Sequence, residues 1–437
     1  MPIPPTLIRM RVRSDMKTLK TILITALLWI STAFAGSAAY LLIPMDETQT
    51  NHLKAYGIAY WQLQKGAVGQ WLLNNRGGSF AFPYNQQLEE ECLLREVKSQ
   101  ILSDAAHTAI MADIARPDVN MDVIRLEKAP RIAVYAPFDK QPWDDAVMLA
   151  LDYAEIPYDQ IYDGEIIEGR LAEYDWLHLH HEDFTGQYGK FYRTFSHMAW
   201  YQKQVTENEI MAAKYGFAKV SKMKLHVALT IKSYVAGGGF LFSMCSGADS
   251  FDIALAAQQL DICETMYDGD PADPDINEKL DFSQTFAFHN FRIIEDPLEY
   301  EYSTIDATQS RKVSQHQDYF TLFDFSAKWD PVPTMLSQNH TRVIKGFMGQ
   351  TTAFIRDCVK PSVLIMGESP ALNETRYLHG EFGQGTWTFF GGHDPEDYQH
   401  LVGDEHTDLD LYPNSPGYRL ILNNVLFPAA KKKKQKT

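Results

Sequence analysis

The chain has 437 residues, of which 45% are hydrophobic and 22% charged, and it carries a formal net charge of −16 at pH 7. This length is too great for one small core, so we expect two domains or one large domain with insertions. The acidic balance argues against nucleic acid as a partner, because phosphate binding needs clustered positive charge.

The first 39 residues have the pattern of a secretory signal peptide. In the segment that begins at Met16, two lysines precede the apolar run 22–30, and small residues follow it at Ala33 and Ala35. The apolar run is too short for a confident membrane span, and a retained N-terminal anchor is the alternative. We therefore expect cleavage near Ala35 or Ala38 and a mature protein that is periplasmic or otherwise exported.

Residues 40–127 predict a small α/β unit. "YLLIP" is a short strand, "QTNHLKAYGIAYWQLQKG" has helical spacing, and "VGQWLLN" resumes a strand pattern. The turn "NRGGSF", two helical stretches and the strand "MDVIRL" follow. The segment "EKAP" is the expected boundary between this unit and the next α/β run.

A second α/β run begins directly after this boundary. The strands "RIAVYAP", "YDQIY" and "YDWLHLH" alternate with helices through "PWDDAVMLALDYAEI" and around "GEIIEGRLAEY". This alternation predicts a parallel sheet with helices on both faces. In such sheets the binding residues collect at the carboxyl ends of the strands.

Histidines gather at the end of the third strand of this run. "WLHLHHEDF" places His178 and His180 on one strand face, with His181, Glu182 and Asp183 just beyond it. Two imidazoles and a carboxylate suit an open zinc site, but the spacing is no recognised metal signature. We expect substrate binding by His180, His181 and Glu182, and we predict no metal and no cofactor.

An aromatic insertion, "GQYGKFYRTFSHMAWYQKQ", comes next, and its aromatic spacing favours packing over a wall for stacking sugars. The helix "KMKLHVALTIKSYVA" follows and stops at the glycines 237–239. Residues 264–384 interrupt the α/β pattern with Asp- and Pro-rich loops. The sheet resumes with "GTWTFFGGHDPEDY" and closes with the helix "PGYRLILNNVLFPAA".

The stretch "FLFSMCSGADSFDIALAA" predicts a strand over 240–244, Cys245 at a sharp turn and a helix from about Asp249. Such an elbow lifts the thiol above the sheet, and backbone N–H groups near Ser246 can stabilise an oxyanion. Ser246 and Gly247 are therefore expected to contribute to substrate binding. The helix N-terminus is expected to lower the pKa of the thiol toward the neutral range. A buried structural cysteine in a β–α turn is the alternative.

The other cysteines matter because a disulfide bridge to one of them would occupy the Cys245 sulfur. Four cysteines, at positions 92, 245, 263 and 358, are too few and too scattered for a disulfide scaffold. A bridge between Cys245 and Cys263 stays open, and it would prevent Cys245 from acting as a nucleophile.

The elbow resembles that of class I glutamine amidotransferase-like proteins, whose pattern is G-x-C-x-G. Cys245 and Gly247 match this pattern, whereas Ser243 replaces the first glycine. The closing segment resembles the ThuA-like trehalose-utilisation family, which shares the same flavodoxin-like fold. The resemblance implies a histidine base at His393.

In the amidotransferases a His-Pro-Glu sequence supplies the base and the acid that orients it. This chain has one residue inserted, so the resemblance implies Glu396 or Asp394 as the orienting acid. It covers roughly 129–260 and 384–430. The resemblance therefore implies a flavodoxin-like, amidotransferase-like domain with a parallel sheet and helices on both faces.

This domain is expected to span residues 128–430, with insertions at about 184–220 and 264–384. Residues 431–437 form a lysine-rich tail. We expect the tail to be solvated and to make no peripheral membrane contact.

The whole chain also resembles an exported bacterial family commonly labelled asparagine synthetase B, through "IPMDETQTNHLKAYGIAYW", "FSAKWDPVPTMLSQNHT" and "GGHDPEDYQH". The label implies glutamine-hydrolysing asparagine synthesis, which we do not favour. No N-terminal cysteine follows the signal peptide, and "SGADS" is one residue shorter than the pyrophosphate loop Ser-Gly-Gly-x-Asp-Ser.

The leading hypothesis is an exported hydrolase or acyl transferase that uses Cys245 and His393 on an amide or sugar-derived substrate. The second is a non-catalytic protein that binds a small molecule or carbohydrate, or docks in the envelope, through the same pocket. The third is a metal-dependent hydrolase built on His178, His180 and His393. Oligomeric state stays open.

Overall fold

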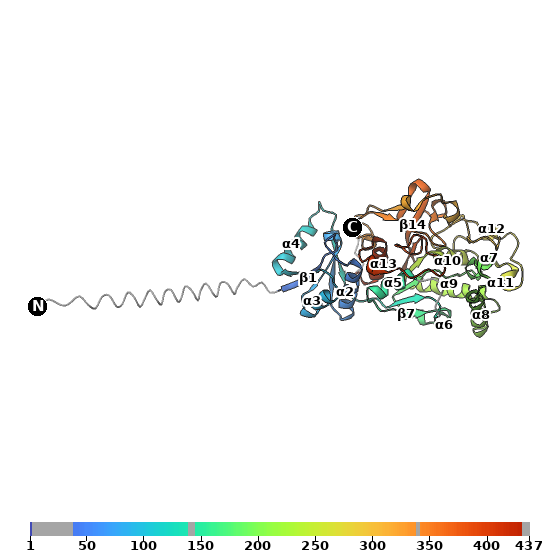
Figure 1. The fold of residues 1–437 in the computed structure, drawn as a ribbon, viewed down its shortest axis with the longest axis horizontal. Helices are drawn as coiled ribbons and strands as arrows, with labels where there is room; N and C mark the ends of the chain where they lie inside the picture. The colour runs from blue at the N-terminus through green and yellow to red at the C-terminus, as the bar shows by residue number, and fades with distance from the viewer. Residues whose placement is uncertain (2–37, 139–144, 338–340, 431–437) are drawn as a thin grey trace.

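A computed structural model describes residue 1 and residues 38–138, 145–337 and 341–430 (Figure 1). The expected signal-peptide region 1–39 lies outside the described residues except at positions 1, 38 and 39. The lysine tail 431–437 lies wholly outside them. Across the described part of the chain, no helix is long and apolar enough to cross a membrane.

Residues 38–126 form a five-stranded antiparallel sheet in the order β4-β1-β3-β2-β5. Its strands are β1 (Ala38–Ile43), β2 (Gly69–Leu73), β3 (Ser79–Pro83), β4 (Gln100–Ser103) and β5 (Asp122–Leu126). Its helices are α2 (His52–Gln64), α3 (Gln86–Leu94) and α4 (Asp104–Ala115). The sequence predicted an α/β unit here but missed β3 and β4.

Side-chain caps explain where these helices begin. The side chains of Asn51, Asn85 and Ser103 each accept a hydrogen bond from the backbone N–H three residues later. Each cap satisfies one N–H group that the first helical turn leaves without a partner.

The second sheet has ten strands and is mixed. Five parallel strands stand in the order β7-β6-β8-β9-β15, and the antiparallel strands β14, β13, β10 and β11 continue from β15, with β12 paired to β14. The parallel strands are β6 (Ile132–Tyr135), β7 (Asp159–Ile161), β8 (Trp176–Leu179), β9 (Phe240–Met244) and β15 (Gly385–Phe390). The antiparallel strands are β10 (Tyr319–Leu322), β11 (Val343–Lys345), β12 (Phe354–Ile355), β13 (Leu364–Ser369) and β14 (Glu374–Phe382).

The parallel sheet expected from the sequence accounts for five of these strands, whereas the complete sheet is mixed, and the expected insertion over 264–384 supplies its antiparallel half. Residues 319–382 contribute all five antiparallel strands to the same sheet. These strands are short or interrupted by polar residues and glycines, so their alternation is weak in the sequence. β14 joins them to the parallel strands by pairing with β15, and the other antiparallel strands pair with β14 or with one another.

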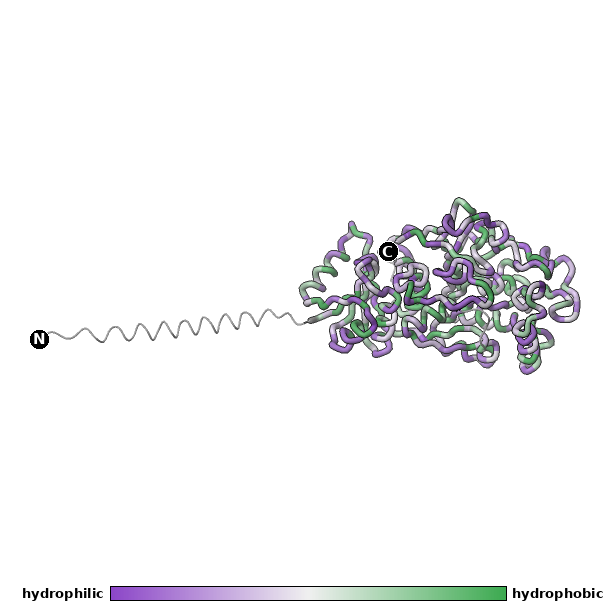
Figure 2. The backbone as a smooth tube through the Cα atoms, viewed as in Figure 1, coloured by the Kyte–Doolittle hydropathy of each residue, from purple (hydrophilic) through white to green (hydrophobic). Residues whose placement is uncertain are grey.

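Helices cover both faces of the parallel strands, as predicted. On one face α5 (Ala146–Tyr153) and α13 (Pro416–Leu426) share a core with the strand residues Val134, Phe242 and Phe390. On the other face α9 (Val220–Ala236) and α10 (Ser246–Ala256) pack against Leu241 and Phe389. Alternate strand residues thus enter opposite cores, and hydrophobic stretches run through the middle of the body (Figure 2).

The remaining helices are α6 (Asp163–Ile167), α7 (Tyr192–Phe195), α8 (Ala199–Lys214), α11 (Thr265–Asp268) and α12 (Ile276–Lys279). The five-stranded unit lies at one end of the body and α8 and α11 at the other (Figure 1). The aromatic residues of the segment 188–201 form their own buried cluster with Tyr267. Their role as packing, rather than as an open sugar-stacking wall, matches the sequence-based expectation.

A buried group of charges links β14 to the segment that precedes β10 and to the segment that follows β11. The Asp318 carboxylate accepts hydrogen bonds from Arg311 at 2.6 Å and from Arg376 at 2.9 Å, and Arg311 also bonds Glu374 at 3.1 Å. Arg376 in turn donates to the carbonyl of Phe347 at 2.8 Å. This group therefore anchors the segment that follows β11, which leads to the candidate site.

Candidate functional site

Three neighbouring parallel strands end at the same edge of the sheet. β8 is paired with β9 and β9 with β15, and their carboxyl ends lead into His180, Cys245 and the loop that carries His393. The structure therefore brings these three sequence-predicted residues to one edge, where α/β sheets bind ligands.

Cys245 occupies a strained elbow between β9 and α10. Its backbone has φ 51° and ψ −138°, a conformation that a non-glycine residue rarely adopts. Its N–H donates to the Phe390 carbonyl at 3.0 Å, which ties the turn to the neighbouring strand. The predicted elbow is confirmed, and the helix begins at Ser246, three residues earlier than expected.

Gly247 is required by a close backbone approach. Its N–H donates to the His180 carbonyl at 2.6 Å, and a Cβ at this position would lie 2.3 Å from that oxygen and 3.0 Å from the Ser243 hydroxyl. The second glycine of the elbow thus joins β8 to α10. Ser243, which replaces the first glycine of the pattern, is accommodated as a buried residue.

Replacing Gly247 with alanine is expected to destabilise the fold by about 1–3 kcal/mol, because the new methyl group must displace the His180 backbone. Chemical unfolding measures this change. Gly237→Ala is the matched control, since a Cβ there meets its nearest neighbours at 3.5 Å and φ is not positive. Equal stability of the two variants would contradict the close approach.

The environment of the Cys245 sulfur differs from the expected one. The side chain is fully buried, and burial raises the pKa of the thiol to about 12, although N–H groups of Thr351, Ser246 and Gln350 hydrogen-bond it and oppose the rise. The prediction that the helix N-terminus brings this pKa toward neutrality is wrong for the resting structure. Desolvation of the thiolate outweighs the three donors.

A short segment after β11 covers the sulfur. An ideal Cβ on Gly349 would lie 2.9 Å from the Cys245 sulfur and 2.9 Å from the backbone nitrogen of His393. The backbone of Gly349 therefore lies directly between the elbow and the strand end that carries His393.

The four cysteines are all free thiols. Cys263, the partner considered for Cys245, instead donates its S–H to the Thr185 carbonyl at 3.3 Å. The Cys245–Cys263 bridge that the sequence left open is therefore absent from this structure.

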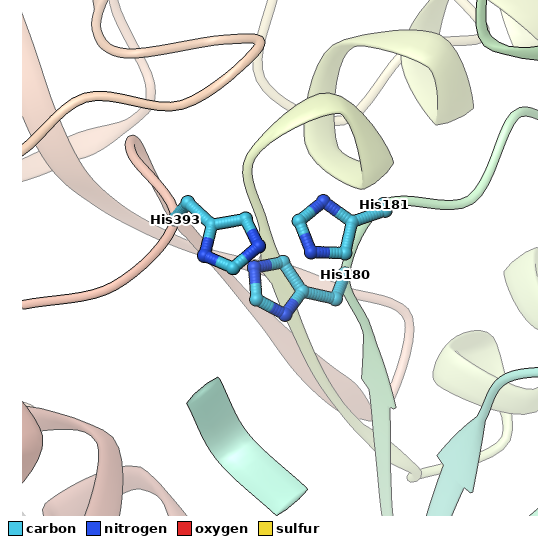
Figure 3. Close-up of side chains that lie close together, drawn as sticks. All are labelled: His180, His181 and His393. Atoms are coloured by element: carbon cyan, nitrogen blue, oxygen red, sulfur yellow. The ribbon is translucent and has the colours of Figure 1, made fainter. Parts of the chain in front are cut away.

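His180, His181 and His393 lie together beside the elbow (Figure 3). The ring centroids are 3.8 Å apart for His180 and His181, 4.0 Å for His181 and His393, and 4.7 Å for His180 and His393. His400 also stacks on His393, with ring centroids 4.7 Å apart. We call His180, His181 and His393 the histidine cluster.

His393 is buried within this cluster, and its ring makes no hydrogen bond to the Cys245 sulfur. Burial, together with the neighbouring His181 and His180, holds the pKa of His393 well below its usual range, so the ring is neutral at pH 7. Among the described residues, neither ring nitrogen of His393 has a hydrogen-bond partner. The expected thiol–imidazole hydrogen bond is thus not formed in the resting structure.

The carboxylates expected to orient His393 serve other partners. Asp394 accepts hydrogen bonds from Thr407 at 2.6 Å and Tyr418 at 2.8 Å and closes a turn at the Glu396 N–H. The Glu396 side chain bonds Ser415, the N-cap of α13, and burial raises its pKa. Neither residue orients the imidazole, because the residue inserted into His-Asp-Pro-Glu directs both carboxylates toward α13 and its neighbouring loop.

Asp145, which the sequence did not single out, is the carboxylate that reaches the histidines. Its oxygens lie 3.2 Å from Nε2 of His178 and 3.3 Å from Nδ1 of His180, and His178 also bonds the Phe242 carbonyl through Nδ1 at 3.2 Å. Burial opposes ionisation, yet His178 and His180 hold the pKa of Asp145 well below its usual range. The pattern "PWDDAV" offered only a helix cap as a clue, because Asp145 also caps α5.

Glu182 faces a different part of the molecule. Its carboxylate accepts a hydrogen bond from the Tyr162 hydroxyl at 3.2 Å, and burial raises its pKa to about 7 against the pull of Lys224. Glu182 lines a small polar pocket with Tyr162, Lys224 and Asn208. The structure thus separates Glu182 from the histidine pair that precedes it in the sequence.

No protein-family model and no curated protein matches the sequence. Among solved structures, the chain is similar to the cytoplasmic protein STM3548 from Salmonella typhimurium, with 11% identity, a TM-score of 0.33, and coverage of 69% of this chain and all of that one.

The chain is also similar to the cytoplasmic protein STM1381 from Salmonella typhimurium LT2, with 11% identity, a TM-score of 0.30, and coverage of 69% of this chain and all of that one. A β-galactosidase from Bacillus circulans sp. alkalophilus has 10% identity and a TM-score of 0.26 over 61% of this chain and 29% of that one. At these TM-scores the likeness assigns no activity to this chain.

Proposed function

We propose that this chain is a hydrolase or acyl transferase of the amidotransferase-like type, in which Cys245 attacks an amide or sugar-derived substrate. The parallel strand order β7-β6-β8-β9-β15 corresponds to 2-1-3-4-5 in chain order and supports a flavodoxin-like domain. The candidate signal peptide supports export of the mature protein.

One observation carries the proposal: the φ of 51° at Cys245. A non-glycine residue in a sparsely populated backbone region costs about 1–3 kcal/mol and persists only where surrounding contacts enforce it. The Cys245–Phe390 and Gly247–His180 hydrogen bonds do so here. This strain turns a thiol toward three backbone N–H groups, an arrangement that suits an anion developing at the elbow.

The resting structure is a protonated, covered state of this site. Reaction requires the Gly349–Thr351 segment to move off the sulfur so that substrate and solvent reach it. The neutral His393 imidazole then accepts the thiol proton, and the Ser246 N–H group, which stays at the elbow when the segment moves, stabilises the oxyanion formed on the substrate carbonyl.

Site-selective alkylation tests the proposal. Folded protein is treated with iodoacetamide across pH 7–9, and the labelled peptides are mapped by mass spectrometry. Cys245 is expected to react at least about tenfold faster than Cys263, although both are fully buried, because only Cys245 combines elbow strain with three N–H donors. Equal, slow labelling of both cysteines would contradict the nucleophile.

A non-catalytic binding protein is the second candidate, and buried polar groups without partners favour it. Within the described chain, the hydroxyls of Ser246 and Tyr302 and one oxygen of Asp249 are buried without a hydrogen-bond partner. These groups suit a ligand rich in hydroxyl or amide groups. Saturable binding of such a ligand without turnover would select this candidate.

A further inference from the structure

We propose that His180, His181 and His393 bind one divalent transition-metal ion of the zinc type. One ring nitrogen from each histidine lies within 4.8 Å of the others, and the three side chains converge from the ends of β8 and β15 (Figure 3). Three imidazoles with an open fourth position form a recurrent catalytic zinc site.

The hydrogen bonding of the cluster supports a ligand that the protein alone does not supply. His180 is 1% exposed and His393 4% exposed, yet Nε2 of His180 and both ring nitrogens of His393 have no hydrogen-bond partner among the described residues. A buried polar group left without a partner destabilises the folded state, because it has lost its hydrogen bonds to water. A metal ion bonded to these nitrogens removes that destabilisation.

Asp145 supplies the support that metal-bound histidines ordinarily have. Its Oδ1 lies 3.3 Å from Nδ1 of His180, which leaves Nε2 of the same ring for the ion. A carboxylate on the far nitrogen fixes the ring orientation and makes the imidazole a stronger ligand. His178 is not a ligand in this arrangement, because its two nitrogens face the Phe242 carbonyl and Asp145.

Two other clusters of metal-ligating residues lack these features. At Asp261, Cys263 and Asp268, the Lys219 ammonium group lies 2.5 Å from Asp261 and 3.0 Å from Asp268, so a cation already occupies the centre. The cluster of Asp397, His400 and Asp404 includes an exposed carboxylate, and Asp404 accepts the Leu401 N–H at 2.8 Å.

The ion deepens the proposed function, and this step rests on it. The Gly247–His180 hydrogen bond, at 2.6 Å, places the histidine cluster beside the elbow. A water molecule on the open position of a zinc ion has a pKa near 7, so a bound hydroxide is available at neutral pH. That hydroxide accepts the proton of the Cys245 thiol and becomes water. In the metal-bound protein the hydroxide therefore acts as the base in place of the His393 imidazole.

Metal binding is measured on the full mature chain without substrate. Elemental analysis after dialysis is expected to find about one zinc per chain, and the cobalt(II) form is expected to show the visible absorption of a tetrahedral ion. H181A and H393Q are expected to weaken zinc affinity more than about 100-fold, and D145N, which keeps the α5 cap, by about 10–100-fold. H226Q, at an exposed histidine on α9, is the control and is expected to bind like the wild type.

Circular dichroism of each variant establishes that it is folded before binding is compared. Wild-type protein without stoichiometric metal or tetrahedral cobalt absorption would overturn the site, as would unchanged affinity in folded H181A and H393Q. Turnover that depends on Cys245 but persists in metal-free protein would remove the metal and leave the proposed function standing. Stoichiometric metal without any Cys245 reactivity would establish the metal site and reject Cys245 as the nucleophile.

Discussion

Asp318→Ala is expected to lower the free energy of unfolding by about 3–5 kcal/mol, because it leaves two buried guanidinium groups without their shared carboxylate. Asp318 and Arg376 are fully buried, and Arg311 has 4% of its side chain exposed. Urea unfolding at pH 7 measures the change. Asp324→Ala is the control, since its ion pair with Arg342 is largely exposed and is worth less than about 1 kcal/mol.

The same carboxylate predicts an acid-sensitive fold. Although burial raises it, Arg311 and Arg376 hold the pKa of Asp318 below its ordinary value of 3.8. The folded state therefore binds the proton more weakly than the unfolded state, so this contribution is complete above pH 3.8 and is lost as the pH falls through the lower, folded-state value. A loss of stability in Asp318→Ala that stayed constant below pH 3 would contradict the charge interaction.

The effect of Asp318 is expected to extend to the elbow. Its backbone carbonyl accepts the Gly346 N–H at 2.8 Å, and Arg376, its partner, holds the Phe347 carbonyl at 2.8 Å. These bonds fix the start of the segment that covers the Cys245 sulfur. Alkylation of Cys245 in Asp318→Ala protein that remains folded is therefore expected to accelerate.

Cys245→Ala is expected to reduce turnover at least about 1000-fold on any amide or sugar-derived substrate that the wild type cleaves, because no other described thiol lies at the elbow. The loss should appear in kcat, since the sulfur bonds the reacting carbon and contributes little to initial binding. Steady-state kinetics at several pH values measure it.

Cys263→Ala is the matched control for this variant. Cys263 is equally buried, but its thiol donates to the Thr185 carbonyl, away from the elbow. Full turnover in a folded Cys245→Ala protein would reject the nucleophile. Ligand affinity that survived in that protein without any turnover in the wild type would favour the binding candidate instead.

Several parts of the fold could be predicted because the sequence patterns that specify them are local. The apolar runs of β6, β8 and β9, the stop at glycines 237–239 and the strand–Cys–Gly–helix pattern each lie within a few residues of one another. Alternation, capping and turn residues act over that range, so the sequence predicted the parallel strands and helices on both faces. The elbow followed from the same local pattern.

The antiparallel half of the large sheet could not be predicted in this way. β10 pairs with β13, which lies well beyond it in the chain, whereas β13 and β14 each pair with the next strand along the chain. Their short, polar-interrupted sequences carry little alternation, and pairing and burial supply what local propensity does not. For this reason the sequence alone predicts an insertion over 264–384.

The sequence by itself determined the elbow, the strand ends and which chemical groups stand there: one thiol and several imidazoles. Only the tertiary structure decided their state and partners. It buries the Cys245 sulfur under the Gly349 backbone and raises its pKa, since desolvation depends on segments about 100 residues apart. It also turns Asp394 and Glu396 away from His393 and brings in Asp145, because side-chain direction is set by packing against α13 and α5 rather than by spacing in the chain.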